Sequence, residues 1–218
     1  MRYQTVLFDL DGTLVDNSRG IFQGFRYALE RLGIPEEGRL DRRVIGPPLR
    51  RGFAERFGVP EEDLERAVAL YREYYRPTGV LECDLYPGVE EMLRTLHASG
   101  VSLWLATSKA EVFARQILEH FNLTGLFGGI VGSELSGGRD TKAEVITHIL
   151  RQLPADGFPA LMVGDRDQDA AGAQDMGLDM AVVLWGFGSR AEFEGFGCVQ
   201  AFFDTAPALT DWILEERG

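Results

Sequence analysis

The chain has 218 residues, 45% of them hydrophobic, which supplies core material for one large domain or a domain with a smaller companion and excludes a disordered chain. A formal net charge of −12 excludes the basic footprint of a nucleic-acid-binding protein, and no apolar run is long enough to cross a membrane. The two cysteines, Cys83 and Cys198, lie far apart and the N-terminus has no leader pattern, so we expect a protein of the reducing cytoplasm.

The first predicted element is a buried strand at residues 6–8 that ends in two carboxylates, Asp9 and Asp11. Gly12 follows them, and its backbone freedom allows a sharp turn. Two acids this close repel each other unless a cation or a shared proton holds them. The pattern favours a metal site in which one acid is the nucleophile and the other carries a proton.

The next stretch, residues 16–83, is predicted to contain helices only. Apolar residues at helical spacing predict a first helix from Asn17 or Ser18 to Gly33. A second runs from Leu49 to Gly58, and a third starts near residues 60–62 and carries apolar residues at helical spacing from Leu64 to Tyr75.

From residue 84 onward, strands alternate with helices. A helix opens after Tyr86-Pro87-Gly88, and others begin at Ser108 and at Thr141-Lys142, with a last one around residues 209–213. Core strands are predicted at residues 101–106, 129–131, 160–163 and 180–184. This alternation predicts an α/β fold with a doubly wound parallel sheet. Residues 1–15 and 84–218 would form that core domain, and residues 16–83 an inserted helical cap domain.

Polar residues follow four of the predicted strands, where a parallel sheet gathers its ligands. Each cluster alone has an ordinary explanation, such as a helix cap or a solvated charge, but all four at one edge indicate a site. The clusters are Asp9/Asp11/Thr13, Thr107/Ser108, Lys142, and Asp165/Asp167/Asp169.

The order of these clusters resembles the haloacid dehalogenase-like (HAD) superfamily of phosphatases over the whole chain. Its four motifs match Asp9 to Thr13, Thr107, Lys142, and Gly164-Asp165 to Asp169. A cap between the first two motifs is typical of the helical-cap subfamily. Three further segments resemble its phosphoglycolate-phosphatase-like branch, namely residues 45–49, 86–89, and 164–166 followed by 185–189.

The resemblance implies catalytic roles for the first motif. Asp9 would attack phosphorus and form an aspartyl-phosphate, and Asp11 would protonate the leaving group and then activate water. Asp9, the backbone carbonyl of Asp11 and Asp165 would bind Mg²⁺.

It also implies residues that bind and support the phosphoryl group. The phosphoryl oxygens would be bound by Thr107, Lys142 and the amide of Ser108. This amide would lie at the start of the predicted helix, where free N–H groups bind anions. Asp169 would orient Lys142 or a metal-bound water, and Thr13 would support the metal ligands without contacting the metal itself. Apart from this resemblance, Arg43, Arg50 and Arg51 of the cap are candidates to contact a second anionic group of the substrate, and we expect Arg50 to influence substrate choice.

The expected function is therefore that of a Mg²⁺-dependent phosphomonoester hydrolase acting on a small phosphorylated metabolite, phosphoglycolate-phosphatase-like. A 5′-nucleotidase or a sugar phosphatase, a phosphomutase of the β-phosphoglucomutase kind, and a non-enzymatic binding protein on the same fold remain alternatives. Asp11 argues against a hydrolytic dehalogenase, which lacks this second acid. Leu10 argues against the transport ATPases, which have lysine at that position.

Overall fold

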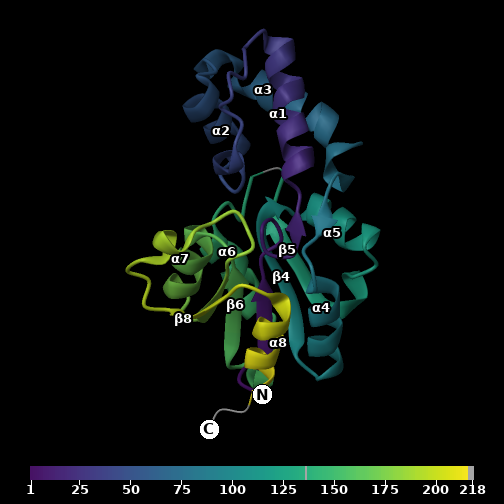
Figure 1. Ribbon diagram of the computed structural model, residues 1–218, viewed down its shortest axis with the longest axis vertical. Coiled ribbons are helices and arrows are strands. Elements are labelled where there is room, and N and C mark those ends of the chain that lie inside the picture. Colours follow the sequence, from purple (N-terminus) through teal and green to yellow (C-terminus); the bar gives the residue numbers. More distant parts are fainter. Residues whose placement is uncertain (136, 216–218) are drawn as a thin grey trace. The chain divides into compact units, whose positions relative to one another are not determined.

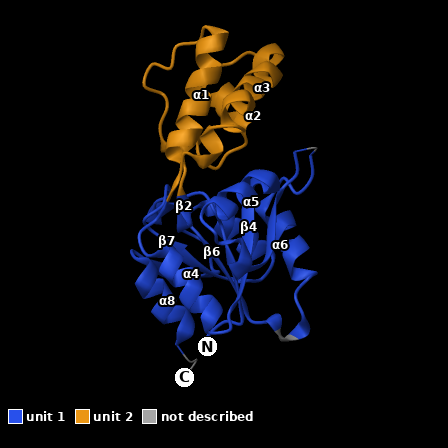
Figure 2. Cartoon of the chain, turned by 90° about the vertical axis from the view of Figure 1, so that its right-hand side faces the viewer, with its two compact units in different colours: residues 1–15, 85–218 blue, residues 16–84 orange. Residues whose placement is uncertain are grey.

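The computed structural model describes residues 1–135 and 137–215, which divide into two compact units. The first unit contains Met1–Val15 and the chain from Leu85 onward, and the second unit is Asp16–Asp84 (Figure 2). None of the helices within the described residues is long and apolar enough to cross a membrane.

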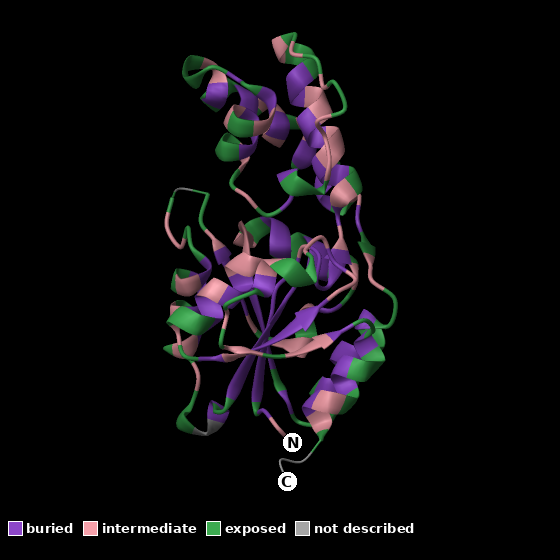
Figure 3. Ribbon diagram, turned by 60° about the vertical axis from the view of Figure 1, so that its left-hand side comes forward, coloured by how far each residue is buried: buried purple, intermediate pink, exposed green. Residues whose placement is uncertain are grey.

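The first unit is built on a six-stranded sheet in the order β5-β4-β1-β6-β7-β8, and every neighbouring pair is parallel (Figure 1). The central strands β1 and β6 are mostly apolar and buried along their whole length (Figure 3), as expected for a sheet covered on both faces. The predicted doubly wound parallel sheet is confirmed. Its strands are β1 (Thr5–Phe8), β4 (Ser102–Ala110), β5 (Phe127–Ser133), β6 (Ala160–Gly164), β7 (Asp179–Val183) and β8 (Val199–Phe203).

Helices cover both faces of this sheet. On one face α6 (Lys142–Leu150) and α7 (Asp167–Asp175) pack with strand residues such as Leu7 and Met162 into one buried cluster. The opposite side carries α4 (Val89–Ala98), α5 (Glu111–His120) and α8 (Ala206–Leu214) (Figure 1). Single 3₁₀ turns lie at Thr124–Leu126, Ala155–Gly157 and Arg190–Phe193.

The second unit packs its helices around aromatic side chains. The ring centroid of Phe25 lies 4.7 Å from that of Phe53 and 5.3 Å from that of Tyr71. Gly33 and Gly58 end two helices in the left-handed conformation, at φ 70° and 66°, as the sequence predicts. The elements are α1 (Ser18–Leu32), α2 (Leu49–Phe57) and α3 (Leu64–Tyr75), with 3₁₀ turns at Arg42–Val44, Glu61–Asp63 and Gly79–Leu81.

The two connecting segments pair as a second, two-stranded sheet of β2 (Val15–Asp16) and β3 (Asp84–Leu85). The prediction of an entirely helical stretch is therefore wrong at Asp16. The sequence reading also omits α7 and the edge strand β8.

The prediction of a helix beginning at Ser108 is wrong. Strand β4 continues to Ala110, and α5 begins at Glu111. The pairing of β4 with β5 shifts register between Ala106 and Ala110, and the Lys109 amide donates to Thr107 Oγ1 at 3.2 Å. The segment 107–109 is thus a bulge in the strand, a feature that redirects side chains at the edge of a sheet.

Candidate active site

The strand order brings the predicted clusters together because β1 lies between β4 and β6. Phe8, the last residue of β1, is in register with Leu105 on one side and Val163 on the other. Asp9 therefore follows β1 where β6 ends at Gly164 and where the pairing of β4 becomes irregular after Ala106. Its amide donates to the Val163 carbonyl at 2.9 Å. This is the edge at which parallel sheets bind ligands.

Lys142 fixes the Asp9 carboxylate. Its Nζ atom lies 2.7 Å from Asp9 Oδ1, 2.8 Å from Asp169 Oδ1 and 2.8 Å from the Ala106 carbonyl oxygen. Burial by itself lowers the pKa of Lys142, but Asp169 and Asp9 outweigh burial and raise that pKa. The raised pKa keeps the ammonium charged. Lys142 is also the first residue of α6, which begins with a capping box between Thr141 and Glu144, so its backbone is fixed in place.

Asp165, at the end of β6, is held by donors from two loops. Its Oδ2 accepts from the Phe187 amide at 2.7 Å and the Gly188 amide at 3.3 Å, and its Oδ1 accepts from Thr13 Oγ1 at 3.4 Å. Glycine is required beside it: Gly12 has φ +90°, and a Cβ there would lie 2.2 Å from Asp165 Oδ2. The contribution of the 186–188 segment was not predicted, although the sequence contains it in a recognisable Trp-Gly-Phe-Gly-Ser run.

Three carboxylates meet here, since Asp9, Asp165 and Asp169 each offer an oxygen within 4.8 Å of the others. Burial, followed by repulsion from Asp169 and Asp9, raises the pKa of Asp165 to about 8. Burial also raises the pKa of Asp169, against the opposing effect of Lys142. Hard oxygen donors with an excess of buried negative charge fit Mg²⁺.

Asp11 is paired with a residue that the sequence analysis did not single out. Lys109 Nζ lies 2.8 Å from Asp11 Oδ2, and the two side chains are 8% and 16% exposed. Burial raises the pKa of Asp11, and Lys109 opposes that shift. A signal was available: Lys109 and Lys142 are the only lysines of the chain, whose other twenty cations are arginine.

The remaining predicted residues lie in different surroundings. Thr107 is buried in the β4 bulge, and the Ser108 carbonyl accepts from Ser133 Oγ at 3.0 Å. Asp169 Oδ2 accepts from the Arg166 amide at 3.1 Å, so both its oxygens are bonded. Arg50 belongs to the second unit, where its guanidinium pairs with Glu61 and Glu65.

A model of the family described as haloacid dehalogenase-like hydrolase matches residues 6–183, which include every one of these carboxylates and both lysines. The chain belongs to this family. It is 43% identical to a 5′-nucleotidase of Pseudomonas aeruginosa, over 88% of this chain and 87% of that protein. It is 31% identical to a phosphoglycolate phosphatase of Aquifex aeolicus, over 84% and 86% of the two chains.

The fold also matches a solved structure of protein tyrosine kinase A (PtkA) from Mycobacterium tuberculosis, with a TM-score of 0.84 and 38% identity over 98% of this chain and 99% of that chain. The chain spans 65% of the full PtkA sequence. Relatives with one fold and similar identities thus carry names of different activities. The site chemistry of this chain must therefore be argued from its own residues.

Proposed function

We propose that this phosphatase hydrolyses small phosphorylated metabolites through a phosphoryl group held transiently on Asp9. The observation that carries the proposal is the Asp9 carboxylate itself, buried at the sheet edge with Lys142 on Oδ1 and two further carboxylates within 4.8 Å. A carboxylate fixed beside a buried cation and two further acids is suited to attack on an anionic phosphoryl group. A purely structural ion pair would not need the additional carboxylates.

In the proposed reaction, an oxygen of Asp9 forms a bond to phosphorus while the bond to the leaving oxygen breaks. Asp11 gives its proton to that oxygen, then accepts a proton from the water that attacks the aspartyl-phosphate and releases inorganic phosphate. Lys142, Thr107 and the amide of Ser108 would bind the phosphoryl oxygens that do not react. The Ser108 amide would act from the β4 bulge rather than from a helix N-terminus.

We further propose that Asp9, Asp165 and the backbone carbonyl of Asp11 bind Mg²⁺, with Thr13 and Asp169 supporting the carboxylates from behind. The hydrogen bond from Thr13 Oγ1 to Asp165 and the ion pair between Asp169 and Lys142 support those two roles. When bound, Mg²⁺ would offset the repulsion between the carboxylates and the phosphoryl group.

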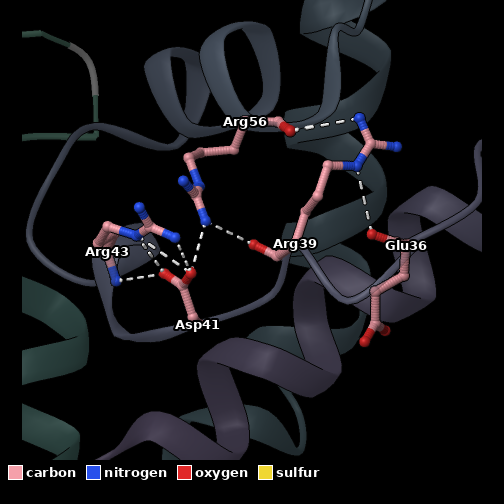
Figure 4. A network of polar contacts seen from close by, with 5 residues as sticks. All are labelled: Glu36, Arg39, Asp41, Arg43 and Arg56. Carbon is pink, nitrogen blue, oxygen red and sulfur yellow. Dashed lines mark hydrogen bonds and ion pairs between the residues drawn. The ribbon is translucent and has the colours of Figure 1, made fainter.

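For the substrate, we place nucleoside 5′-monophosphates first and phosphoglycolate second. The 5′-nucleotidase relative is 43% identical to this chain and the phosphoglycolate phosphatase 31%. Phosphoglycolate would also need a cation for its carboxylate, but the candidate arginines of the second unit pair with acids. Arg43 pairs with Asp41 (Figure 4), Arg50 with Glu61 and Glu65, and Arg51 with Glu55.

A panel of phosphate esters tests this proposal. The protein is incubated with Mg²⁺ and with nucleoside monophosphates, phosphoglycolate, sugar phosphates and p-nitrophenyl phosphate, and both released phosphate and isomerised sugar phosphate are measured. We expect phosphate from p-nitrophenyl phosphate, and faster release from nucleotides than from phosphoglycolate. Isomerisation without phosphate release would instead identify a phosphomutase, and the reverse ranking would restore phosphoglycolate to first place.

Transfer from Asp9 to a tyrosine hydroxyl is a second candidate, favoured by the likeness to PtkA. It needs a nucleoside triphosphate donor, whereas hydrolysis of a monoester needs none. Incubation with radiolabelled ATP and a tyrosine-containing peptide distinguishes the two. Labelled peptide, with no phosphate released from any monoester, would replace the hydrolase proposal.

A further inference from the structure

Lysine is used in this chain only where the side chain is buried at the candidate site. Lys142 and Lys109 are its two lysines, against twenty arginines, and their side chains are 4% and 8% exposed. Each lies within 2.8 Å of one carboxylate of the first motif, Lys142 of Asp9 and Lys109 of Asp11. An ammonium is a compact point charge, whereas the broader planar guanidinium of arginine needs more room. This selective use of lysine indicates that both positions require a small buried cation.

The backbone that carries Lys109 is itself fixed. Lys109 lies in the β4 bulge, where its amide donates to Thr107 Oγ1 at 3.2 Å and the Ser108 carbonyl accepts from Ser133 Oγ. A regular strand would direct alternate side chains to opposite faces of the sheet, and the bulge interrupts that alternation. The same irregularity therefore positions both Thr107 and the Lys109 ammonium at the carboxyl edge of the sheet.

Asp11, in contrast, belongs to no strand of the main sheet, and its backbone forms only an isolated bridge with Val15. It lies beyond the end of β1 and directly before Gly12, whose φ of +90° marks a turn. A proton donor must be held within a fraction of an ångström of the reacting oxygen to be effective. The 2.8 Å ion pair to Lys109 bridges 98 positions of sequence and ties this carboxylate to a strand of the sheet.

We propose that Lys109 is a positioning residue, which holds the Asp11 carboxyl group in the orientation needed to protonate the leaving oxygen. This inference rests on the proposed function. Lys109 contacts Asp11 and acts through it, whereas Lys142 acts on Asp9 and on the transferred phosphoryl group. In this proposal Lys109 assists departure of the leaving group through Asp11, and Lys142 assists the nucleophile, Asp9.

The experiment compares Lys109→Met with the wild type on phenyl phosphate and p-nitrophenyl phosphate, two esters of similar shape. Phenolate is a poor leaving group that needs a proton, whereas nitrophenolate leaves readily without one. We expect Lys109→Met to lower kcat/KM by about 100-fold on phenyl phosphate and by less than about 5-fold on p-nitrophenyl phosphate. Both esters are assayed on one preparation, so the ratio is independent of the folded fraction.

Asp11→Asn and the double variant provide the decisive comparison. Asp11→Asn should show the same leaving-group pattern, and adding Lys109→Met to it should change kcat/KM on phenyl phosphate by less than about 3-fold, because coupled residues are not additive. Lys109→Gln serves as a second variant if the methionine variant does not fold. Arg2→Met is the matched control, because it removes a partly buried ion pair to Glu215 at the far end of the chain, and its ratio should equal that of the wild type.

Equal losses on both esters in Lys109→Met, or a full additional loss in the double variant, would overturn the inference. The proposed function would survive that result, provided that the wild type releases phosphate and Asp9→Asn does not. A wild type that hydrolyses neither ester in the presence of Mg²⁺ would instead refute the proposed function itself.

Discussion

The ion pairs of the first unit's site are buried and formed by lysine, whereas those of the second unit are exposed or partly exposed and formed by arginine. Every cation between residues 16 and 84 is an arginine. Asp41 accepts hydrogen bonds from Arg43 and Arg56 (Figure 4), and those from Arg43 hold the pKa of Asp41 well below its usual range. In the first unit, burial raises the pKa of Asp165 to about 8 despite its hydrogen bonds from backbone amides.

This difference separates two uses of charge. An exposed ion pair contributes only about 0–1 kcal/mol, because water screens it. Buried carboxylates are costly for the fold and persist where chemistry requires them. Removing a charge should therefore change activity greatly in the first unit and only slightly in the second.

The largest expected effect is that of Asp9→Asn. The change keeps the volume but removes the proposed nucleophile, so we expect phosphate release to fall by at least about 1,000-fold. Folding should be retained, because Asp165 and Asp169 lose a repelling neighbour. Phosphate release and circular dichroism are measured on one preparation, checked for deamidation. Asp167→Asn is the matched control, because we assign this neighbouring acid no role, and retained activity in Asp9→Asn would exclude Asp9 as the nucleophile.

Next in size is the effect of removing divalent metal. Excess chelator should lower phosphate release by at least about 100-fold, and Mg²⁺ should restore it. The reason is that the ammonium of Lys142 alone does not neutralise the carboxylates of Asp9, Asp165 and Asp169. Calcium should not restore phosphate release, since Ca²⁺ accepts looser, higher coordination. Asp165→Asn should need far more Mg²⁺ for the same rate. Full turnover in chelator, or normal rates with calcium, would contradict the metal assignment.

A moderate effect is expected on the pH dependence of stability in the metal-free protein. The pKa of Asp165 is raised to about 8 from its ordinary value of 3.8, so between these values the folded chain binds more protons than the unfolded chain. Its contribution to stability therefore falls as pH rises through this range. In chelator, the thermal midpoint should fall by roughly 3–8 °C between pH 5.5 and 8. Asp165→Asn should flatten this slope, and an unchanged slope would show that Asp165 is not the group responsible.

The smallest expected effect concerns Arg50 in the second unit. Its charge is already paired with Glu61 and Glu65, so Arg50→Ala should shift the ratio of nucleotide to p-nitrophenyl phosphate hydrolysis by only about 3–10-fold. Arg51→Ala, which removes an exposed pair to Glu55, is the matched control and should shift the ratio by less than about 2-fold. Equal losses on all substrates in Arg50→Ala would show that Arg50 does not select the substrate.

The sequence by itself determined the elements whose signals are local. Helices α1 and α2 end at glycines because only glycine adopts φ near +70° at little cost, and α6 begins at a Thr–Glu capping box. The apolar run before Asp9 and the one before Asp165 predicted two strands, and their alternation with helices predicted the parallel sheet. Since the carboxyl ends of parallel strands lie at one edge of a sheet, the placement of these acids at one edge followed from the sequence pattern.

The tertiary structure alone decided the features that depend on distant partners. The β4 bulge arises from its register against β5, so no local pattern separated it from a helix beginning at Ser108. Pairing of Lys109 with Asp11 crosses 98 residues, and the amides of Phe187 and Gly188 reach Asp165 from more than 20 residues away. Sequence patterns show which residue types are present, whereas the packing of the sheet determines which of them form ion pairs and hydrogen bonds with one another.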